Sequence, residues 1–186
     1  MTADTNDVPD QVAVATIQMA VDSASVQERT HRAKALVAEA ADAGAQLVVL
    51  PELWPAGFFA FDHYDAVAEP LEGAFTRELR SWAVEHGIWL HTGSFVERGA
   101  DGRLYNTVLV VAPTGEVTSR YRKTHLFGYA SREASLLAPG DGPHTWESPY
   151  GPVGMAICYD LRFPRHFDAM RCQAPSMILL CASWPA

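Results

Sequence analysis

A run of strand-like segments in the middle of the chain limits the possible folds more than any other feature of the sequence. The segments are rich in β-branched and aromatic residues and are separated only by short turns that contain Gly, Pro or Asp. They are residues 88–97, 104–112 and 116–122. Strands that follow one another without intervening helices break the pattern of a simple parallel α/β sheet.

The segment before this run alternates between strand and helix. Residues 12–19 and 46–50 predict strands, and the helix between them carries apolar residues at helical spacing until Gly44 ends it. Candidate N-cap residues for this helix are Asp22, Ser23 and Ser25. Residues 74–86 predict a second helix, closed by Gly87. Together the two patterns predict an α/β protein with mixed sheets and outer helices.

The second half of the chain begins with a long loop at residues 123–143, and loops of this length inside a domain are usually functional. Short strands, a helix and a last buried strand are expected at residues 145–147, 153–157, 164–173 and 176–182. No repeat or linker divides the chain, so we expect a disordered tail at residues 1–10 and one domain over residues 11–186. Because no closing helix follows the last strand, we expect this domain to be incomplete at its C-terminus.

Charge and cysteine content exclude several classes of function. The net charge of −8 argues against a nucleic-acid partner and against anionic membrane surfaces, which need a basic face. No apolar run approaches the roughly 20 residues that span a bilayer, and the N-terminus has no signal-peptide pattern. An odd count of three cysteines without a CxxC pair is neither a disulfide framework nor a zinc pattern. A reducing cytoplasm is the simplest setting for such a chain.

Three apolar runs end abruptly on a reactive side chain. LVVLPE ends on Glu52, SRYRK on Lys123 and VGMAIC on Cys158. Functional sites collect at the carboxyl ends of strands in α/β sheets. A thiol that meets a carboxylate and an ammonium there has a base for its proton and a cation for the oxyanion, which is a site for acyl transfer. From the residues alone, a solvated Lys123 and an inert buried Cys158 remain open alternatives.

The segments LPELWPAGF, RKTHLF and GMAICYDLRFP resemble the three signatures of the nitrilase superfamily of carbon-nitrogen hydrolases, in the family's order. The resemblance implies a four-layer α-β-β-α sandwich that assembles into homodimers or larger homo-oligomers. It also implies that Glu52 is the general base, Lys123 the cationic partner and Cys158 the nucleophile. Glu133, shortly before the Pro-Gly turn at residues 138–140, matches a second glutamate that orients Lys123 or the attacking water. No metal or organic cofactor is implied.

The sequence after the nucleophile, CYDLRFP, is more similar to the ω-amidase branch than to true nitrilases. The resemblance therefore implies a hydrolase that cleaves a small linear amide through a cysteine thioester and releases ammonia. The alternatives are an N-carbamoyl compound or a nitrile as substrate, or a catalytically silent fragment that acts as a binding or oligomerising subunit. The backbone N–H of Tyr159 is expected to help hold the oxyanion. Trp54 is expected to form a wall of the substrate pocket, with a place in the plain core as the open alternative.

The remaining candidates receive structural interpretations. Cys172 and Cys181 are expected to be inert buried thiols. Three histidines raise the question of a metal site, but their spacing matches no ligand pattern; they are His125, His144 and His166. We expect His125 to be a structural hydrogen-bonding residue behind Lys123. A salt bridge between Asp160 and Arg162 is expected to fix the turn that carries the nucleophile.

Overall fold

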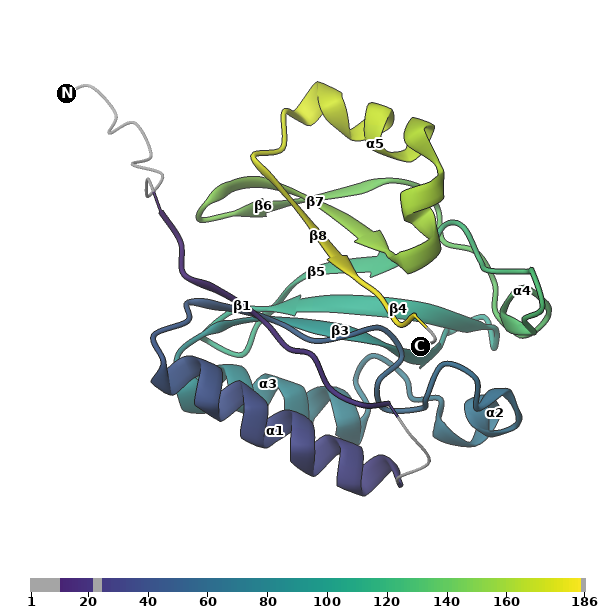
Figure 1. The fold of residues 1–186 in the computed structure, drawn as a ribbon, viewed down its shortest axis with the longest axis horizontal. Coiled ribbons are helices and arrows are strands. Elements are labelled where there is room, and N and C mark those ends of the chain that lie inside the picture. Colours follow the sequence, from purple (N-terminus) through teal and green to yellow (C-terminus); the bar gives the residue numbers. More distant parts are fainter. Residues whose placement is uncertain (1–10, 22–24, 185–186) are drawn as a thin grey trace.

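The computed structural model of the chain describes residues 11–21 and 25–184, so the expected tail at residues 1–10 and the candidate caps Asp22 and Ser23 lie outside the described residues. The described chain forms two β-sheets that pack face to face, with helices on the outer side of each (Figure 1). This α-β-β-α arrangement confirms the four-layer sandwich that the sequence predicts.

The larger sheet has five strands in the order β1-β2-β3-β4-β5. They are Val14–Thr16 (β1), Leu47–Val49 (β2), Trp89–Arg98 (β3), Leu104–Val111 (β4) and Val117–Arg122 (β5). The first three strands are parallel to one another, whereas β4 is antiparallel to both β3 and β5. The run of successive strand patterns therefore forms β3, β4 and β5, which make this sheet mixed.

The smaller sheet has three strands in the order β6-β7-β8. They are His144–Ser148 (β6), Gly151–Ile157 (β7) and Met177–Cys181 (β8). β6 and β7 are antiparallel, while β7 and β8 are parallel. The apolar layer between the two sheets is built from both, with Val108 and Val110 of β4 meeting Met155 and Ile157 of β7.

Two long helices cover the outer face of the larger sheet: α1 (Val26–Asp42) and α3 (Ala74–His86). Ser25 caps α1 through a capping box with Glu28, which satisfies backbone donors at the start of the helix. α3 has the predicted bounds and ends at Gly87, whose left-handed conformation a glycine adopts at low cost. None of the helices among the described residues is long and apolar enough to cross a membrane.

The short elements surround the two sheets. They are the helices Tyr64–Val67 (α2), Glu133–Leu136 (α4) and Pro164–Met170 (α5), and the 3₁₀ turns Phe61–His63 (η1), Cys158–Arg162 (η2) and Arg171–Gln173 (η3). α5 covers the outer face of the smaller sheet (Figure 1). The predicted helix at 164–173 is thus shorter, because the chain tightens into η3 after Met170. Cys172 lies on that turn and is exposed, so the expectation that it is buried was wrong.

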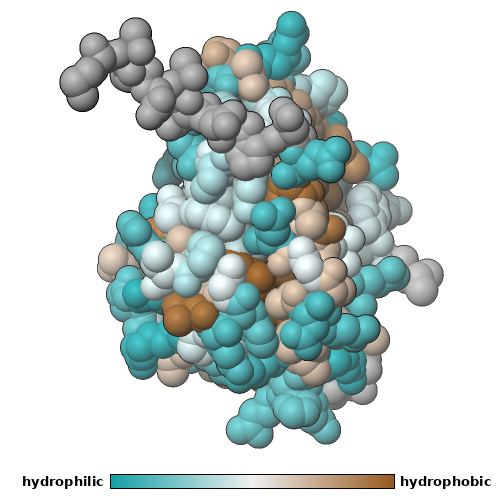
Figure 2. Space-filling model, turned by 90° about the vertical axis from the view of Figure 1, so that its left-hand side faces the viewer, coloured by the Kyte–Doolittle hydropathy of each residue, from teal (hydrophilic) through white to brown (hydrophobic). Residues whose placement is uncertain are grey.

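The surface is mixed in character. On the face in Figure 2, hydrophobic residues form small separate patches among hydrophilic ones. Large apolar side chains that are exposed among the described residues include Phe59, Ile178 on the edge strand β8, and Trp184. Phe59 and Trp184 both line a hollow of about 800 Å³ beside the end of β8.

Candidate active site

Glu52 stands on a turn just after β2, and a bulge in β3 holds that turn in place. Ser94 donates its backbone N–H to the carbonyl of Pro51 at 3.0 Å, and its hydroxyl accepts the N–H of Leu53 at 2.9 Å. Gly93, at the bulge, has φ +61°, and a Cβ there would lie 2.2 Å from the Pro51 carbonyl oxygen. Only glycine allows so close an approach, which fixes the carboxylate of Glu52 at the edge of the sheet.

Lys123 follows the last residue of β5, and its backbone is held from both sides. Its N–H donates to the carbonyl of Asn106 on β4 at 2.9 Å, and its carbonyl accepts the N–H of Gly140 at 2.9 Å. A Cβ on Gly140 would lie 2.1 Å from the carbonyl oxygen of Arg122. The Pro-Gly turn at residues 138–140 therefore packs directly against the strand end that presents the lysine.

Cys158 is the first residue after β7 and opens the 3₁₀ turn η2. Its φ is +42°, a left-handed conformation that costs energy for any residue other than glycine. The surrounding structure must hold this turn in place, and strained residues of this kind gather at functional sites. The bend turns the thiol from the end of β7 toward Glu52.

The structure brings the predicted charged residues together. The Lys123 Nζ lies 2.8 Å from Glu52 Oε1 and 3.0 Å from both carboxylate oxygens of Glu133. All three side chains are 0% exposed. Glu133 is the first residue of α4, and its Oε2 also accepts the backbone N–H of Phe127 at 2.7 Å. One ammonium thus bridges two buried carboxylates.

The Cys158 thiol, 7% exposed, lies beside this group. Burial raises its pKa to about 12; the charge of Glu52 and a hydrogen bond to that carboxylate also raise it, while Lys123 opposes them. The thiol is therefore protonated at neutral pH. Because only the thiolate is a good nucleophile, attack requires a base within reach, and Glu52 is in position to be that base.

The ionisation of Glu52 and Lys123 follows from burial and from the two opposing charges. Burial raises the pKa of Glu52 above its usual value, and the nearby Glu133 adds to this, although Lys123 works against it. Burial favours the neutral form of Lys123, but the carboxylates of Glu52 and Glu133 outweigh it and raise the pKa of the lysine. Lys123 is thus a permanent cation, whereas Glu52 accepts a proton more readily than an ordinary glutamate.

Two further contacts of this group were not predicted from the sequence. Asn106 on β4, fully buried, donates through Nδ2 to Glu52 Oε1 at 3.1 Å and to Glu133 Oε1 at 2.9 Å. The backbone N–H of Ser183, just beyond β8, donates to Glu52 Oε2 at 3.0 Å. The only signal for Asn106 is a polar amide within the otherwise apolar strand pattern LYNTVLVV.

The two expected substrate-binding residues lie in different surroundings. Tyr159 is half-buried beside Cys158, and its ring packs edge-on against Phe127. The role of its backbone N–H stays a prediction. Trp54 is fully buried on the helical side of the larger sheet, where its ring packs against Trp82 and its Nε1 donates to the carbonyl of Thr92 at 2.9 Å. The structure therefore corrects the expectation for Trp54, which is a core residue.

The turn after the nucleophile is fixed in another way than expected. Asp160 forms no ion pair with Arg162; instead it accepts the Nδ1–H and the backbone N–H of His125, at 2.8 and 2.9 Å. The guanidinium of Arg162 lies over the ring of Trp184, 5.7 Å from its centre. His125 is thus the structural hydrogen-bonding residue that the sequence predicts, and the predicted salt bridge was wrong.

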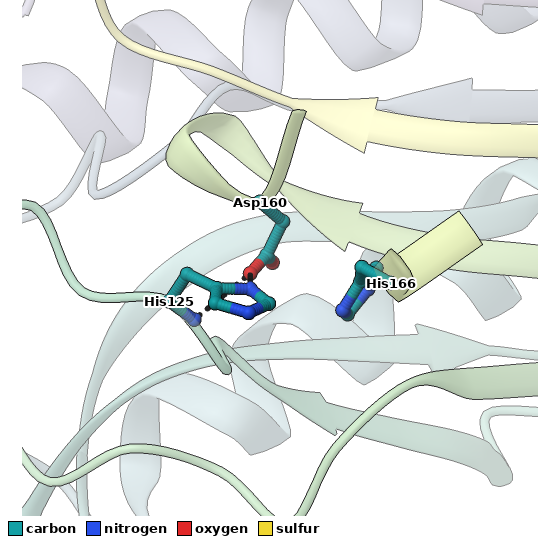
Figure 3. A group of neighbouring side chains, drawn as sticks. All are labelled: His125, Asp160 and His166. Carbon is teal, nitrogen blue, oxygen red and sulfur yellow. Dashed lines mark hydrogen bonds and ion pairs between the residues drawn. The ribbon is translucent and has the colours of Figure 1, made fainter. Parts of the chain in front are cut away.

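One group of side chains among the described residues has the composition of a metal site: His125, Asp160 and His166, whose ligand atoms lie within 4.8 Å of one another. Figure 3 shows the Asp160 carboxylate pointing toward the His125 imidazole, with His166 farther to the right. His144 is not part of this group; its Nε2 lies 2.8 Å from the hydroxyl of Ser119. The Asp160 oxygens are already occupied by protein donors, so the group fits a hydrogen-bond network better than a metal centre.

A hollow of about 800 Å³ adjoins the turns that flank Glu52. Pro51 and Ser183 contribute to its lining, together with residues 17–21 and 57–60. None of the four predicted catalytic side chains lines it. It therefore lies next to the reacting groups rather than around them.

A four-layer α-β-β-α sandwich with a glutamate–lysine–cysteine group at its strand ends defines a nitrilase-type protein. The family of carbon-nitrogen hydrolases matches residues 13–183. Given this match over most of its length, the chain belongs to the carbon-nitrogen hydrolase family.

Among curated relatives, 2-oxoglutaramate amidase of Paenarthrobacter nicotinovorans is 33% identical, with 94% of this chain and 62% of the relative covered. The human omega-amidase NIT2 is 38% identical, with 81% and 55% covered. Among solved structures, Nit3 of Saccharomyces cerevisiae, a member of branch 10 of the nitrilase superfamily, has a TM-score of 0.85 at 25% identity, over 100% of this chain and 69% of that one. An amidase from Nesterenkonia sp. has a TM-score of 0.81 at 25% identity, over 93% and 65%. The chain spans less than two thirds of the length of these curated relatives.

Proposed function

We propose that this chain carries the site of a thiol-dependent amidase that hydrolyses a small linear amide to a carboxylic acid and ammonia. The observation that carries the proposal is the buried group in which one lysine bridges two glutamates beside a protonated thiol. A fold that only needed stability would gain little from two carboxylates and one ammonium removed from water. Buried, perturbed groups of this kind are typical of catalytic sites.

In the first step, Glu52 takes the proton of the Cys158 thiol as the sulfur attacks the amide carbonyl carbon. A C–S bond forms, and the carbonyl π electrons move to the oxygen. As Glu52 is neutralised, its attraction for Lys123 weakens, and the ammonium becomes available to the new oxyanion. The total charge of the site stays constant, because the negative charge moves from the carboxylate to the oxyanion. The backbone N–H of Tyr159 is the second proposed donor, and one such donor is typically worth about 10²–10³ in rate.

In the second step, the protonated Glu52 gives its proton to the departing nitrogen, and the C–N bond breaks to leave a thioester on Cys158. Water then attacks the thioester carbon as Glu52 takes its proton, and the C–S bond breaks as Glu52 returns that proton to the sulfur and restores the thiol. Glu133 holds Lys123 through both of its oxygens, so the ammonium keeps its place when Glu52 is neutral. Every proton in this scheme is carried by a residue of the chain, by the substrate or by water.

The preferred substrates are linear ω-amides that bear a carboxylate. This proposal draws on the sequence CYDLRFP after the nucleophile and on two relatives whose names describe them as 2-oxoglutaramate amidase and omega-amidase. N-carbamoyl compounds and nitriles are the alternatives for the same thiol. A catalytically silent subunit is the alternative of another class.

We further propose that the protein forms homodimers or larger assemblies. The supporting observation is that β8 is the edge strand of the smaller sheet, with Ile178 on it 45% exposed. An edge strand with exposed apolar side chains pairs readily with another chain. Sedimentation velocity tests this proposal, and a monodisperse monomer at micromolar concentration would contradict it.

Ammonia release from a panel of short ω-amides, N-carbamoyl compounds and nitriles tests the function. Wild-type protein is expected to turn over ω-amides best, and Cys158→Ala to lower the rate to background. The matched control is Cys172→Ala, which removes an exposed thiol that makes no contact with the reacting groups and is expected to keep the wild-type rate. A wild-type rate equal to that of Cys158→Ala on every compound would show that the chain by itself is a silent subunit.

A further inference from the structure

We propose that Asp160 is a positioning residue, whose carboxylate ties the turn that carries Cys158 to the strand end that carries Lys123. The inference rests on the proposed function, since it concerns the geometry of the same reacting groups. Asp160 itself is fully buried and does not belong to the group around Lys123. Its contacts reach both reactive residues through residues one or two positions away from them in sequence.

On the nucleophile side, the Asp160 Oδ2 accepts the backbone N–H of Ile157 at 2.9 Å. Ile157 precedes Cys158, and Asp160 stands two residues after it. The hydrogen bond therefore closes a small ring around the one residue in this turn with a left-handed backbone, at φ +42°. A carboxylate that accepts a backbone N–H in this way offsets part of the cost of that conformation.

On the lysine side, the same carboxylate holds residues two positions before and two positions after Lys123. The hydroxyl of Tyr121 donates to Asp160 Oδ2 at 2.6 Å, while the backbone N–H and the Nδ1–H of His125 donate to Oδ1 at 2.9 and 2.8 Å. Lys123 is thus bracketed by two anchors to one buried carboxylate.

The anchors are themselves rigid. The Tyr121 hydroxyl accepts the backbone N–H of Thr124 at 3.1 Å, and of its possible acceptors the Asp160 Oδ2 at 2.6 Å is closer than the Thr124 hydroxyl at 3.1 Å. The imidazole of His125 stacks on the ring of Phe163, with the ring centres 3.7 Å apart and the planes 9° from parallel. Neither Tyr121 nor His125 can therefore shift easily to keep its hydrogen bond if the Asp160 carboxylate moves.

This link is needed because the two reactive residues belong to different sheets. β5 delivers Lys123 and pairs with β4, whereas β7 delivers Cys158 and pairs with β6 and β8. No strand ladder among the described residues joins β5 to β7. Hydrogen bonds within the sheets therefore do not determine the distance from the ammonium to the thiol. Without Asp160, only side-chain packing would determine it. The hydrogen bonds of Asp160 add a directional constraint on that distance. A misplacement of about 1 Å in such a pair can cost about 10² in rate.

A metal ion between His125, Asp160 and His166 is the competing interpretation of the group in Figure 3. Each Asp160 oxygen already accepts two hydrogen bonds, so coordination would have to displace the protons of Tyr121 or His125. His166 makes only long contacts through Nε2, 3.4 Å to the Met155 carbonyl and 3.5 Å to the Tyr121 hydroxyl. The direct and short bonds all belong to the positioning network.

Asp160→Asn tests the proposal, because it keeps the size of the side chain but replaces one acceptor oxygen with a donor that faces other donors. We expect kcat to fall about 10²-fold while KM stays within about twofold of the wild-type value. A second readout does not depend on amide turnover: the rate of iodoacetamide labelling of Cys158 relative to Cys172, from peptide mass spectrometry. The exposed Cys172 is an internal reference thiol in the same chain. We expect the ratio to fall in Asp160→Asn.

Asp168→Asn is the matched control, since this substitution removes the same negative charge at an exposed position on α5. It is expected to keep both kcat and the labelling ratio. If Asp160→Asn does not fold, His125→Asn and His125→Leu replace it as test variants. Asn keeps a side-chain donor near the Nδ1 position and is expected to retain more kcat than Leu.

A folded Asp160→Asn protein with wild-type kcat and wild-type labelling ratio would overturn the proposal, as would equal kcat for wild type, His125→Asn and His125→Leu. A structural role alone would lower the melting temperature and leave kcat per folded molecule unchanged, which also counts against positioning. If wild-type protein hydrolyses no amide, the proposed function fails, while the labelling ratio still decides the role of Asp160.

Discussion

Arg122 and Lys123 are neighbours in sequence, yet their side chains enter two different kinds of buried charge cluster. Arg122, 17% exposed, donates through Nε to Glu97 at 2.9 Å, and its guanidinium lies 3.7 Å from the ring centre of Tyr105. Glu97 also accepts the hydroxyl proton of Thr107 at 2.6 Å. One cation matches one carboxylate, and neutral donors complete the pair. This is an arrangement that a fold uses for structure.

The cluster around Lys123 is not balanced. One ammonium serves Glu52 and Glu133, and a thiol with its proton in place lies beside them. Burial and the second carboxylate raise the pKa of Glu52, so this group holds a base that is poised to accept a proton. The comparison shows that burial of charge does not by itself mark a catalytic site. The proposed function places catalysis at the cluster that has an excess of negative charge next to a thiol.

The largest expected difference between the two clusters is in catalysis. Lys123→Met is expected to lower kcat about 10²–10³-fold, because the oxyanion loses its cationic partner. Arg122→Met is expected to keep kcat per folded molecule, although both variants lose stability, by about 3–5 kcal/mol each, since a buried ion pair is broken. Ammonia release and urea unfolding measure the two effects. An equal loss of kcat in the two variants would erase the distinction between the clusters.

The second comparison uses the two glutamates that pair with these cations. Glu133→Gln is expected to slow turnover about 10²-fold, because Lys123 is less firmly held once Glu52 is protonated. The thioester on Cys158 is expected to accumulate, which intact-mass spectra of quenched reactions reveal. Glu97→Gln makes the same change in the balanced cluster and is expected to affect stability alone. Wild-type kinetics in every phase would remove Glu133 from the site.

The third prediction concerns pH. Glu52 must be ionised to take the thiol proton, and its pKa is raised above the ordinary 4.5 by burial and by Glu133. The pH profile of kcat/KM should therefore fall on the acid side at a pH clearly above 4.5. Because the pKa of Cys158 is about 12, thiol ionisation should not increase the rate between pH 7 and 9. An acid limb at or below 4.5 would contradict the assignment of Glu52 as base.

The sequence was sufficient to predict the strand ends and the residues on them. Apolar runs that stop at Glu52, Lys123 and Cys158 are local features, and the contacts among these three residues show that the carboxyl ends of β2, β5 and β7 do meet. The helix Ala74–His86 and the successive strands β3 to β5 follow equally local patterns. Such features depend on periodicity and on turn residues, which neighbouring amino acids determine.

The errors concern side-chain directions and long-range partners. Trp54 follows Leu53, which has a φ of +44°. The chain turns there, and the indole of Trp54 packs in the core between the larger sheet and its helices. The sequence WPAGFF contains no pattern that predicts this bend. Asp160 accepts hydrogen bonds from His125, which is 35 residues away, and forms no ion pair with Arg162, which is two residues away. Asn106 reaches Glu52 across 54 residues. Partners at such separations are fixed by how the two sheets pack, which no local pattern contains.

The smallest expected effect is a change in folding stability that has opposite signs when a glutamate is replaced in the two clusters. Burial penalises the ionised form of Glu52, so its folded pKa lies above its unfolded value. The carboxyl group therefore favours folding at low pH, where it is protonated, and this contribution is lost as pH rises through the folded pKa. Glu52→Gln removes the penalty at neutral pH and leaves Lys123 paired with Glu133, as one cation with one carboxylate.

Glu52→Gln should therefore melt at the same temperature as wild type or higher at pH 8. A gain of about 1 kcal/mol would correspond to about 2–4 °C for a chain of this size. The gain should shrink toward pH 4, where Glu52 is protonated in the wild type as well. Glu97→Gln should show the opposite sign at pH 8, because it breaks a balanced pair and gains nothing from the removal of a charge. Calorimetric melts of the three proteins at the two pH values test this. The contrary result is a melting temperature for Glu52→Gln at pH 8 that is lowered by the same margin as for Glu97→Gln. That result would mean that the Lys123 cluster is balanced too, and that burial does not destabilise the ionised form of Glu52 in a way that favours proton uptake.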